Sequence, residues 1–204
     1  MKFEEDSEKS GDSQTLSQKR FAQDKKKQIE RTDPSNEGKL DDAIKHVCEK
    51  LNYLSNYYTT SSCSGRIVLI KNLKEKAENV FLFKTHEKIS FKQLKKELER
   101  ISEKYKDEVY FKQETCIIVS ACKSLEDAQN LIDKFKLAGW KRTGIMASRK
   151  RIIVEAISTE YMALPIMDKA RILVDDNYLK RIVKEANRKL ERVWEKIRRF
   201  EKLI

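Results

Sequence analysis

The stretch Tyr57-Tyr58-Thr59-Thr60-Ser61-Ser62-Cys63-Ser64-Gly65-Arg66 leads directly into the apolar run Ile67-Val68-Leu69-Ile70. It places short hydroxyl and thiol side chains, a glycine and an arginine between an expected helix and an expected strand. Backbone N–H groups and hydroxyls of such a loop can bind a carboxylate or phosphate, and an arginine can bind the same anion through two hydrogen bonds. Serine and threonine are also ordinary turn residues, so a simple helix-to-strand turn is the alternative interpretation.

The chain before this stretch divides into a charged tail and a helix. Residues 1–37 contain few apolar side chains and many charges, which predicts a mobile N-terminal tail with a short helix around Arg20 to Ile29. We interpret Lys25-Lys26-Lys27 in that tail as a solvated run of charge. Apolar residues recur at helical spacing over residues 41–55, so a helix is expected there. We expect one folded domain over residues 38–204.

Beyond the opening stretch, pairs of strands alternate with single helices. Strands are predicted over residues 66–70, 80–84, 109–113 and 116–121, and the last is so apolar that a central place in its sheet is expected. Ser90 and Ser124 are predicted N-caps of the helices after the first and second strand pairs, and Gly139 is the expected stop of the second helix. This order favours an α+β fold over a doubly wound parallel sheet.

In the last third of the chain, we expect a hairpin over residues 140–157 with its turn near 149–151. After Pro165 a short strand is expected over residues 171–174, and a long C-terminal helix begins at Asp175 or Asp176. The apolar line of that helix is interpreted as a docking face against the sheet or another helix. The runs Ser64-Gly65-Arg66-Ile67 and Thr143-Gly144-Ile145 open comparable strand pairs, which suggests an internal duplication.

Basic side chains outnumber acidic ones, with 44 lysines and arginines against 33 aspartates and glutamates, a formal net charge of +11. The first 40 residues contain nine of each sign, so residues 41–204 carry the whole excess, 35 basic against 24 acidic side chains. A folded region this basic favours an anionic partner, and nucleic acid is the leading candidate. A lysine- and glutamate-rich surface of thermophilic type is the alternative.

Metal-binding and membrane-spanning patterns are not found in the sequence. The two histidines are far apart and the four cysteines form no CxxC pair, so we expect no metal site. The chain has no signal peptide and no long apolar span, which predicts a soluble, cytoplasmic protein without membrane contact.

Known nucleotide-binding motifs are also absent. The chain has no GxxxxGK[ST] and no GxGxxG after a strand, and its five glycines are scattered, which argues against a Rossmann-type cofactor loop. A nucleophile pair of Cys63 and His86 is conceivable because a thiolate needs a neighbouring base, but nothing in the sequence places the two side chains together. We therefore assign Cys63 to packing.

The predicted hairpin offers the best candidates for RNA contact, which are Lys141, Arg142, Arg149, Lys150 and Arg151. Trp140 is available for base stacking, although a core position after a helix stop is the preferred interpretation. A charged turn that protects a sheet edge is the alternative for the basic residues.

The run Thr59 to Ile67 identifies a family resemblance. Together with Phe81-Leu82-Phe83-Lys84-Thr85-His86 and Gly139-Trp140-Lys141-Arg142-Thr143-Gly144-Ile145, it resembles the tRNA wybutosine-synthesising methyltransferases, the third enzyme of that pathway. The resemblance covers about residues 38–204, and its further matches, in order, are Gly38, Asp41, Glu114, Cys122, Leu125, Asp127-Ala128, Ser158-Thr159, Pro165, Ala186-Asn187, Ile197, Arg199 and Phe200.

The resemblance implies a compact α+β fold with a barrel-like sheet. It also implies methylation, with S-adenosylmethionine, of a tricyclic guanosine derivative next to the anticodon of phenylalanine tRNA. On this hypothesis His86 or Glu114 is the general base, because both match family positions at strand ends. The carboxylate of the cofactor, or of the aminocarboxypropyl group of the substrate, is expected at Ser61, Ser62, Ser64, Gly65 and Arg66.

Several positions depart from the family pattern. Val119 stands where the family usually has histidine, Ile157 where it has arginine, and Thr115, Ala170 and Val193 replace proline, glycine and asparagine. Loss of a histidine and an arginine can remove substrate contacts and leave the fold intact. A non-catalytic or divergent RNA-binding paralogue is therefore the alternative function, and a methyltransferase of small molecules without RNA is a third hypothesis.

Overall fold

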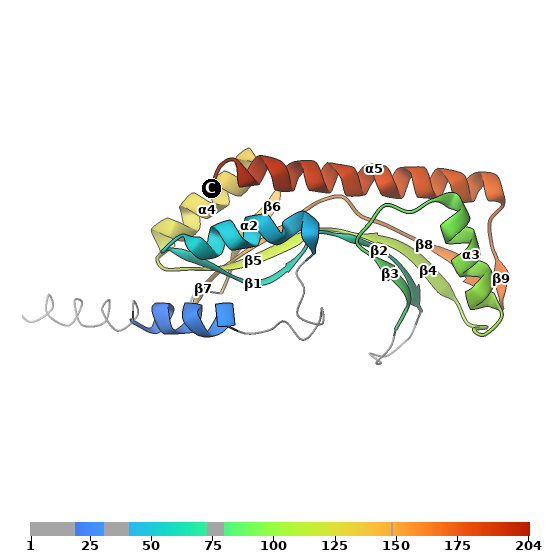
Figure 1. Cartoon of the computed structure of the whole chain (residues 1–204), viewed down its shortest axis with the longest axis horizontal. Coiled ribbons are helices and arrows are strands. Elements are labelled where there is room, and N and C mark those ends of the chain that lie inside the picture. The colour runs from blue at the N-terminus through green and yellow to red at the C-terminus, as the bar shows by residue number, and fades with distance from the viewer. Residues whose placement is uncertain (1–18, 31–40, 73–79, 148) are drawn as a thin grey trace, which may run out of the picture.

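The protein, seen in a computed structural model, consists of two antiparallel sheets beneath a layer of helices (Figure 1). The structure describes residues 19–30, 41–72, 80–147 and 149–204. The first sheet has the strand order β1 (Tyr57–Cys63), β5 (Ile117–Cys122), β7 (Ile152–Ile157), β6 (Arg142–Ala147). The second has the order β3 (Phe81–Thr85), β2 (Arg66–Lys71), β4 (Val109–Glu114), β8 (Met162–Asp168), β9 (Arg171–Ile172). These sheets confirm the α+β class, the 140–157 hairpin and the central place of β5.

One face of the two sheets carries helices α2 (Asp42–Tyr53), α3 (Phe91–Ser102), α4 (Leu125–Leu137) and α5 (Asp176–Glu201). The helix at residues 19–30 lies on the other side of the first sheet (Figure 1). Apolar residues of α2 and α4 pack with the first sheet and those of α3 with the second, whereas the 26-residue α5 runs above both (Figure 1). The N-caps Ser90, Ser124 and Asp175 form as predicted, each accepting a hydrogen bond from the backbone N–H three residues on. No described helix is long and apolar enough to cross a membrane.

Helix α5 joins two hydrophobic cores. Its first apolar residues, up to Leu190, pack with α3 and the second sheet, and its last ones enter the core of the first sheet. There Phe200 stacks on Phe135 with ring centroids 3.8 Å apart, and Trp140 meets Phe135 edge-on at 5.4 Å. The docking face of the helix and the core position of Trp140 are therefore both confirmed.

Three short connections cross between the sheets at one place, which we call the sheet junction. Ser64-Gly65 leads from β1 to β2, Thr115-Cys116 from β4 to β5, and residues 158–161 from β7 to β8. Gly65 has a positive φ of 86°, and a Cβ at this position would lie 3.0 Å from the carbonyl oxygen of Glu114. The crossing therefore requires glycine.

Two predictions about the chain path are wrong. The opening stretch is not a loop, because residues 57–63 form β1 and pair with β5 from Tyr57 opposite Cys122 to Cys63 opposite Ile117. Aromatic and β-branched residues at its start suit a strand, and only Ser64-Gly65 forms the turn. Strand β8 was missed because Pro165 suggested a break. The ladder between β4 and β8 shifts register beside Pro165, an irregularity that accommodates proline.

The predicted helix near Arg20 is confirmed over residues 19–30. One residue of its lysine run is not solvated as interpreted, because Lys25 Nζ donates a hydrogen bond to the carbonyl oxygen of Leu54 and is half-buried. Residues 1–18 and 31–40 lie outside the described residues, and so the division into a tail and a domain at residue 38 stays a prediction. The internal duplication also stays a prediction.

Candidate functional site

Polar side chains from separate parts of the chain gather at the sheet junction. Asp41 Oδ2, just before α2, accepts hydrogen bonds from the backbone N–H of Ser64 at 2.9 Å and from its hydroxyl at 3.2 Å. His86 Nδ1, just after β3, lies 3.0 Å from the same carboxylate oxygen and 3.1 Å from the carbonyl oxygen of Gly65. Cys63 Sγ completes the group, within 4.8 Å of the Asp41 and His86 ligand atoms.

The cluster holds a charged pair. The hydrogen bond to Asp41, and then the one to Cys63, raise the pKa of His86 from 6.5 to about 9, against the opposing effect of burial. Burial alone would raise the pKa of Asp41, but hydrogen bonds from His86 and Ser64 outweigh it and lower that pKa. His86 is therefore an imidazolium bound to a carboxylate at neutral pH.

This charge state bears on three hypotheses. An imidazolium has no lone pair for a proton, so it opposes the base role of His86, which stays a prediction. The fold brings Cys63 and His86 together, although no pattern in the sequence predicts that contact. Within the described residues, Asp41, Cys63 and His86 form the single group of three side chains suited to a metal ion, and such an ion would have to displace the His86 proton.

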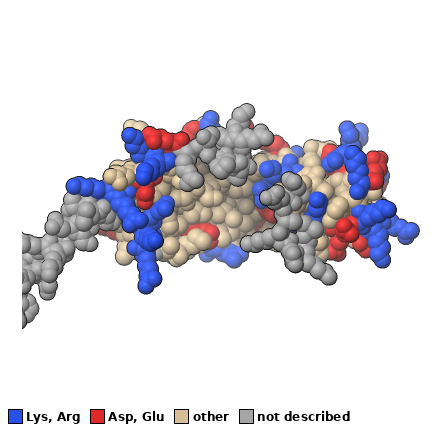
Figure 2. Space-filling model, turned by 90° about the horizontal axis from the view of Figure 1, so that it is seen from below, with Lys and Arg blue, Asp and Glu red and all other residues tan. Residues whose placement is uncertain are grey.

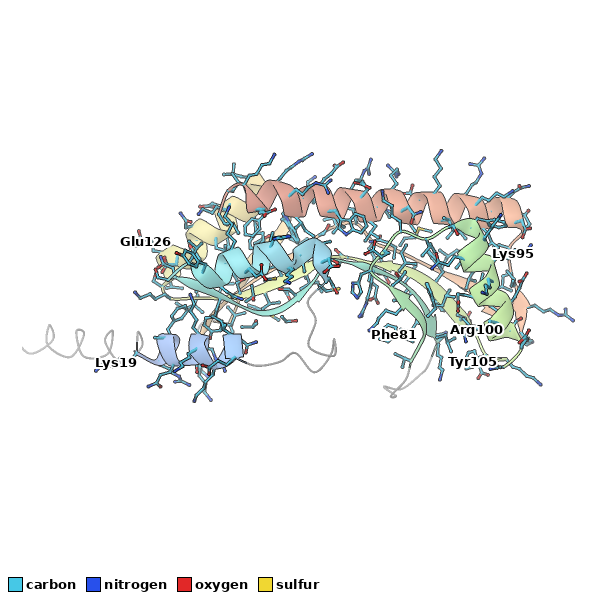
Figure 3. The ribbon with its side chains drawn as sticks, in the orientation of Figure 1. Lys19, Phe81, Lys95, Arg100, Tyr105 and Glu126 are labelled. Atoms are coloured by element: carbon cyan, nitrogen blue, oxygen red, sulfur yellow. The ribbon has the colours of Figure 1, made fainter. Side chains whose placement is uncertain are left out.

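A second ion pair lies on the adjoining strands. Arg66 on β2 is directly opposite Glu114 on β4, and Arg66 Nε donates to Glu114 Oε2 at 2.5 Å. The Arg66 guanidinium also lies 4.8 Å from the ring centroid of Phe81, which projects from β3 on the side away from α5 (Figure 3). About a quarter of each charged side chain is exposed, 28% for Arg66 and 26% for Glu114. These contacts fix the direction of the guanidinium and leave one side open.

The five residues predicted to bind the cofactor do not form one cradle. Ser64 gives both of its donors to Asp41, and Gly65 serves the backbone path. Ser62 has a buried hydroxyl without a hydrogen-bond partner among the described residues. Ser61 is exposed, and Arg66 is partly open. Their assignment to the cofactor stays a prediction, and Ser61 and Arg66 remain the accessible members.

The face of the first sheet away from α2 and α4 carries Ser61 and two of the family departures. Residues opposite one another in a ladder share a face of the sheet, and the pair Ile118 and Ala156 packs in the core covered by helices. Successive residues of a strand point to opposite faces, so Val119 and Ile157 belong to the other face. Ser61 pairs with Val119 and shares that face. Figure 2 looks onto this side of the molecule, where uncharged residues form the middle and lysines and arginines gather around it.

The predicted RNA-binding residues lie in two separate groups. Lys141 and Arg142 stand at the start of β6, and residues 149–151 lie beyond its far end, so that the six-residue strand, roughly 20 Å long, separates them. All five side chains are exposed, and Arg151 pairs with Asp24 of the N-terminal helix at 3.5 Å. RNA binding by these residues stays a prediction.

Two polar residues of the site region had no predicted role. Asp41 matched the family pattern and stands where an N-cap is expected, but its side chain caps no helix and reaches the junction instead. Asn187 on α5 bonds to both the N–H and the carbonyl oxygen of Ile89, at 3.0 and 2.8 Å, and so holds the segment that follows His86. In both cases the hydrogen-bond partner is distant in sequence, so the residue type alone does not indicate the contact.

Fold and site define an α+β protein outside the Rossmann group, with its polar cluster where two antiparallel sheets meet. The sequence profile described as methyltransferase TYW3 matches residues 17–204. The chain belongs to this methyltransferase family, which confirms the resemblance drawn from Thr59 to Ile67 and makes the protein a methyltransferase that uses a methyl donor.

Relatives support the same assignment. The chain is 34% identical to the tRNA(Phe) 7-((3-amino-3-carboxypropyl)-4-demethylwyosine(37)-N(4))-methyltransferase of Thermococcus sibiricus, over 91% of this chain and 95% of that protein. It is 33% identical to the tRNA wybutosine-synthesizing protein 3 homolog of Danio rerio, over 90% and 74%. A solved structure from Pyrococcus horikoshii superposes with a TM-score of 0.80 at 30% identity, over 91% and 94% of the two chains.

Proposed function

We propose that the protein is a cytoplasmic enzyme that methylates the N4 atom of the demethylwyosine base at position 37 of phenylalanine tRNA. The observation that carries this proposal is the family match over residues 17–204, joined to relatives of similar length named for this reaction. The net charge of +11 supports a nucleic-acid substrate.

We assign S-adenosylmethionine as the methyl donor, and the open side of Arg66 fits it. A guanidinium has five N–H donors, and among the described residues only Nε of Arg66 has a hydrogen-bond partner. Four donors are thus available for the carboxylate of the donor or of the substrate side chain, with the exposed hydroxyl of Ser61 as a further donor. When bound, S-adenosylmethionine supplies a methyl group on a sulfonium sulfur.

The protein side chains contribute orientation. Glu114 and Phe81 hold Arg66 in one direction, and the Asp41–His86 pair fixes the turn from which β2 begins. His86 is protonated and bound to Asp41, so it has no free lone pair to take a proton. Glu114 is engaged by Arg66 through Oε2. We therefore assign the rate enhancement to the positioning of donor and acceptor, which can contribute several orders of magnitude.

A divergent RNA-binding member of the family is the second candidate. Val119 and Ile157 replace the polar residues usual at these positions, and both belong to the sheet face that carries Ser61. Compared with the usual family pattern, that face therefore has two fewer polar side chains that could contact a modified base. Such a protein would bind tRNA and leave it unmethylated.

The test uses phenylalanine tRNA from cells that lack this methylation. The full chain and S-adenosylmethionine are added, and nucleosides are analysed by mass spectrometry. The expected product is the precursor with one added methyl group, and Arg66→Ala should lower kcat/KM by on the order of a hundredfold. The matched control is Arg181→Ala, which removes an exposed arginine of α5. Binding without methylation by the wild type would establish the second candidate, and full activity of Arg66→Ala would refute the assigned site.

A further inference from the structure

The helix at residues 19–30 is attached to the uncovered face of the first sheet by one of its sides. The Phe21 ring lies on Tyr58 of β1, with centroids 5.2 Å apart, and Gln28 Nε2 donates to the carbonyl oxygen of Thr60 at 3.2 Å. Figure 1 shows this helix on the opposite side of the sheet from α2. Because β1 is an edge strand, the contact to Thr60 also occupies one of its unpaired carbonyl groups.

Two charged residues of the helix complete this contact. Asp24 pairs with Arg151, which follows the β6–β7 turn, and Lys25 bonds to the carbonyl oxygen that ends α2. The four anchoring positions, 21, 24, 25 and 28, have the spacing of a single helix face. The remaining cations of the helix therefore face solvent or the neighbouring turn, and Lys19 marks its start in Figure 3.

This docking encloses a small basic recess of about 110 Å³ between the helix and the sheet. Five cations line it, and they come from the helix, from the end of β5 and from the β6–β7 turn: Arg20, Lys123, Arg149, Lys150 and Arg151. Asp24 is the one carboxylate in its lining, and it is bound to Arg151. Most of this positive charge has no counter-ion in the lining, and like charges held together repel unless an anion lies between them.

We propose that the basic recess binds backbone phosphates of the RNA substrate, with the helix at residues 19–30 as one wall. This inference rests on the proposed function for the identity of the RNA. Exposed lysines and arginines neutralise phosphates and release counter-ions, which gives affinity without reading the base sequence. The recess lies on the side of the molecule that carries Ser61, so phosphates bound there place the remaining nucleotides along the same face.

The test compares two triple variants of the full chain that remove equal charge. Arg20→Gln, Lys123→Gln and Arg149→Gln alter the recess, whereas Lys180→Gln, Arg181→Gln and Lys184→Gln alter exposed cations of α5 above the opposite face. The dissociation constant for phenylalanine tRNA is measured by fluorescence anisotropy between about 50 and 200 mM salt. The recess variant should bind about tenfold or more weakly, and its salt slope should fall by about two to three units. The α5 variant should keep the wild-type slope.

The outcomes separate this inference from the proposed function. If wild-type protein does not bind tRNA, the proposed function fails; if it binds and both variants lose the same affinity, the recess is not a site. Loss of binding to phosphatidylserine vesicles, with tRNA affinity unchanged, would assign the recess to lipid and overturn the proposal. Phe21→Ala keeps every charge and loosens the helix, so we expect severalfold weaker tRNA binding, and unchanged affinity would exclude the helix as a wall.

Discussion

Replacement of Asp41 by asparagine tests the charged pair at the sheet junction. In the wild type the hydrogen bond to Asp41 raises the pKa of His86 to about 9. A histidine with a raised pKa stabilises the fold fully below its ordinary value of 6.5, and this stabilisation is lost as the pH rises through about 9. Wild-type stability should therefore fall between these pH values, and the Asp41→Asn variant should lack that step.

The magnitude follows from the pKa difference. A shift from 6.5 to about 9 corresponds to at most about 3–4 kcal/mol, at about 1.4 kcal/mol per unit. The His86 side chain is 23% exposed and Asp41 is 6% exposed, so solvent weakens the pair and we expect about 1–2 kcal/mol. At pH 6.5 the variant should be less stable by this amount or more, because Ser64 also loses its charged acceptor.

Two measurements check the effect. Urea unfolding at several pH values between 6 and 10 gives the free energy of unfolding, with Asp42→Asn as the control because Asp42 is the exposed neighbouring carboxylate. That control should keep the wild-type pH profile. The imidazole signals of His86 and His46, assigned with His46→Gln, give the His86 pKa directly by NMR. Titration of His86 near 6.5 in the folded wild type would refute the reasoning.

Three further substitutions test the backbone and the core. Gly65→Ala should cost about 1–3 kcal/mol in the free energy of unfolding, because φ is positive and the new Cβ would lie 3.0 Å from the carbonyl oxygen of Glu114. The control is Gly144→Ala, which has open space around it and should change stability by well under about 1 kcal/mol. Urea unfolding compares the two variants. Ala170→Gly should stabilise by about 0.5–1 kcal/mol, since alanine there has a φ of 60°, and an unchanged thermal midpoint would count against this strain. Trp140→Ala should cost about 3–5 kcal/mol, against about 0.5 kcal/mol or less for the 91% exposed Tyr53→Ala, and similar midpoints for the two would contradict the core assignment.

Local signals located the helices well. Ser90, Ser124 and Asp175 cap helices as predicted because a cap depends on residues within three positions. The same local reasoning failed at Thr59 to Cys63, where serine and threonine are ordinary turn residues although threonine also suits a strand. The deciding interaction is the pairing with β5, more than 50 residues later, which no local pattern contains.

The candidate residues of the site were recognised in the sequence, but most of their partners were not. Arg66 and Glu114 were both selected, yet only the register of β2 and β4 shows that they neutralise each other. Cys63 ends β1 of the first sheet and His86 follows β3 of the second, so only the meeting of the two sheets brings them together. Contacts of this kind arise at the sheet junction, where three connections cross, and their geometry depends on the whole fold.

The stretch from Tyr57 to Arg66 binds a carboxylate of the protein itself, that of Asp41, through Ser64. The N–H and hydroxyl of Ser64 donate to Asp41, so these two donors already have an acceptor, and their assignment to a ligand carboxylate stays a prediction. A ligand carboxylate must then use the donors that stay open, chiefly the guanidinium of Arg66. The two variants consequently divide the roles: Asp41→Asn should change stability and its pH dependence, whereas Arg66→Ala should weaken donor or substrate binding in a folded protein. Equal effects of both on stability would show that the junction is a structural cluster without a separate ligand-binding part.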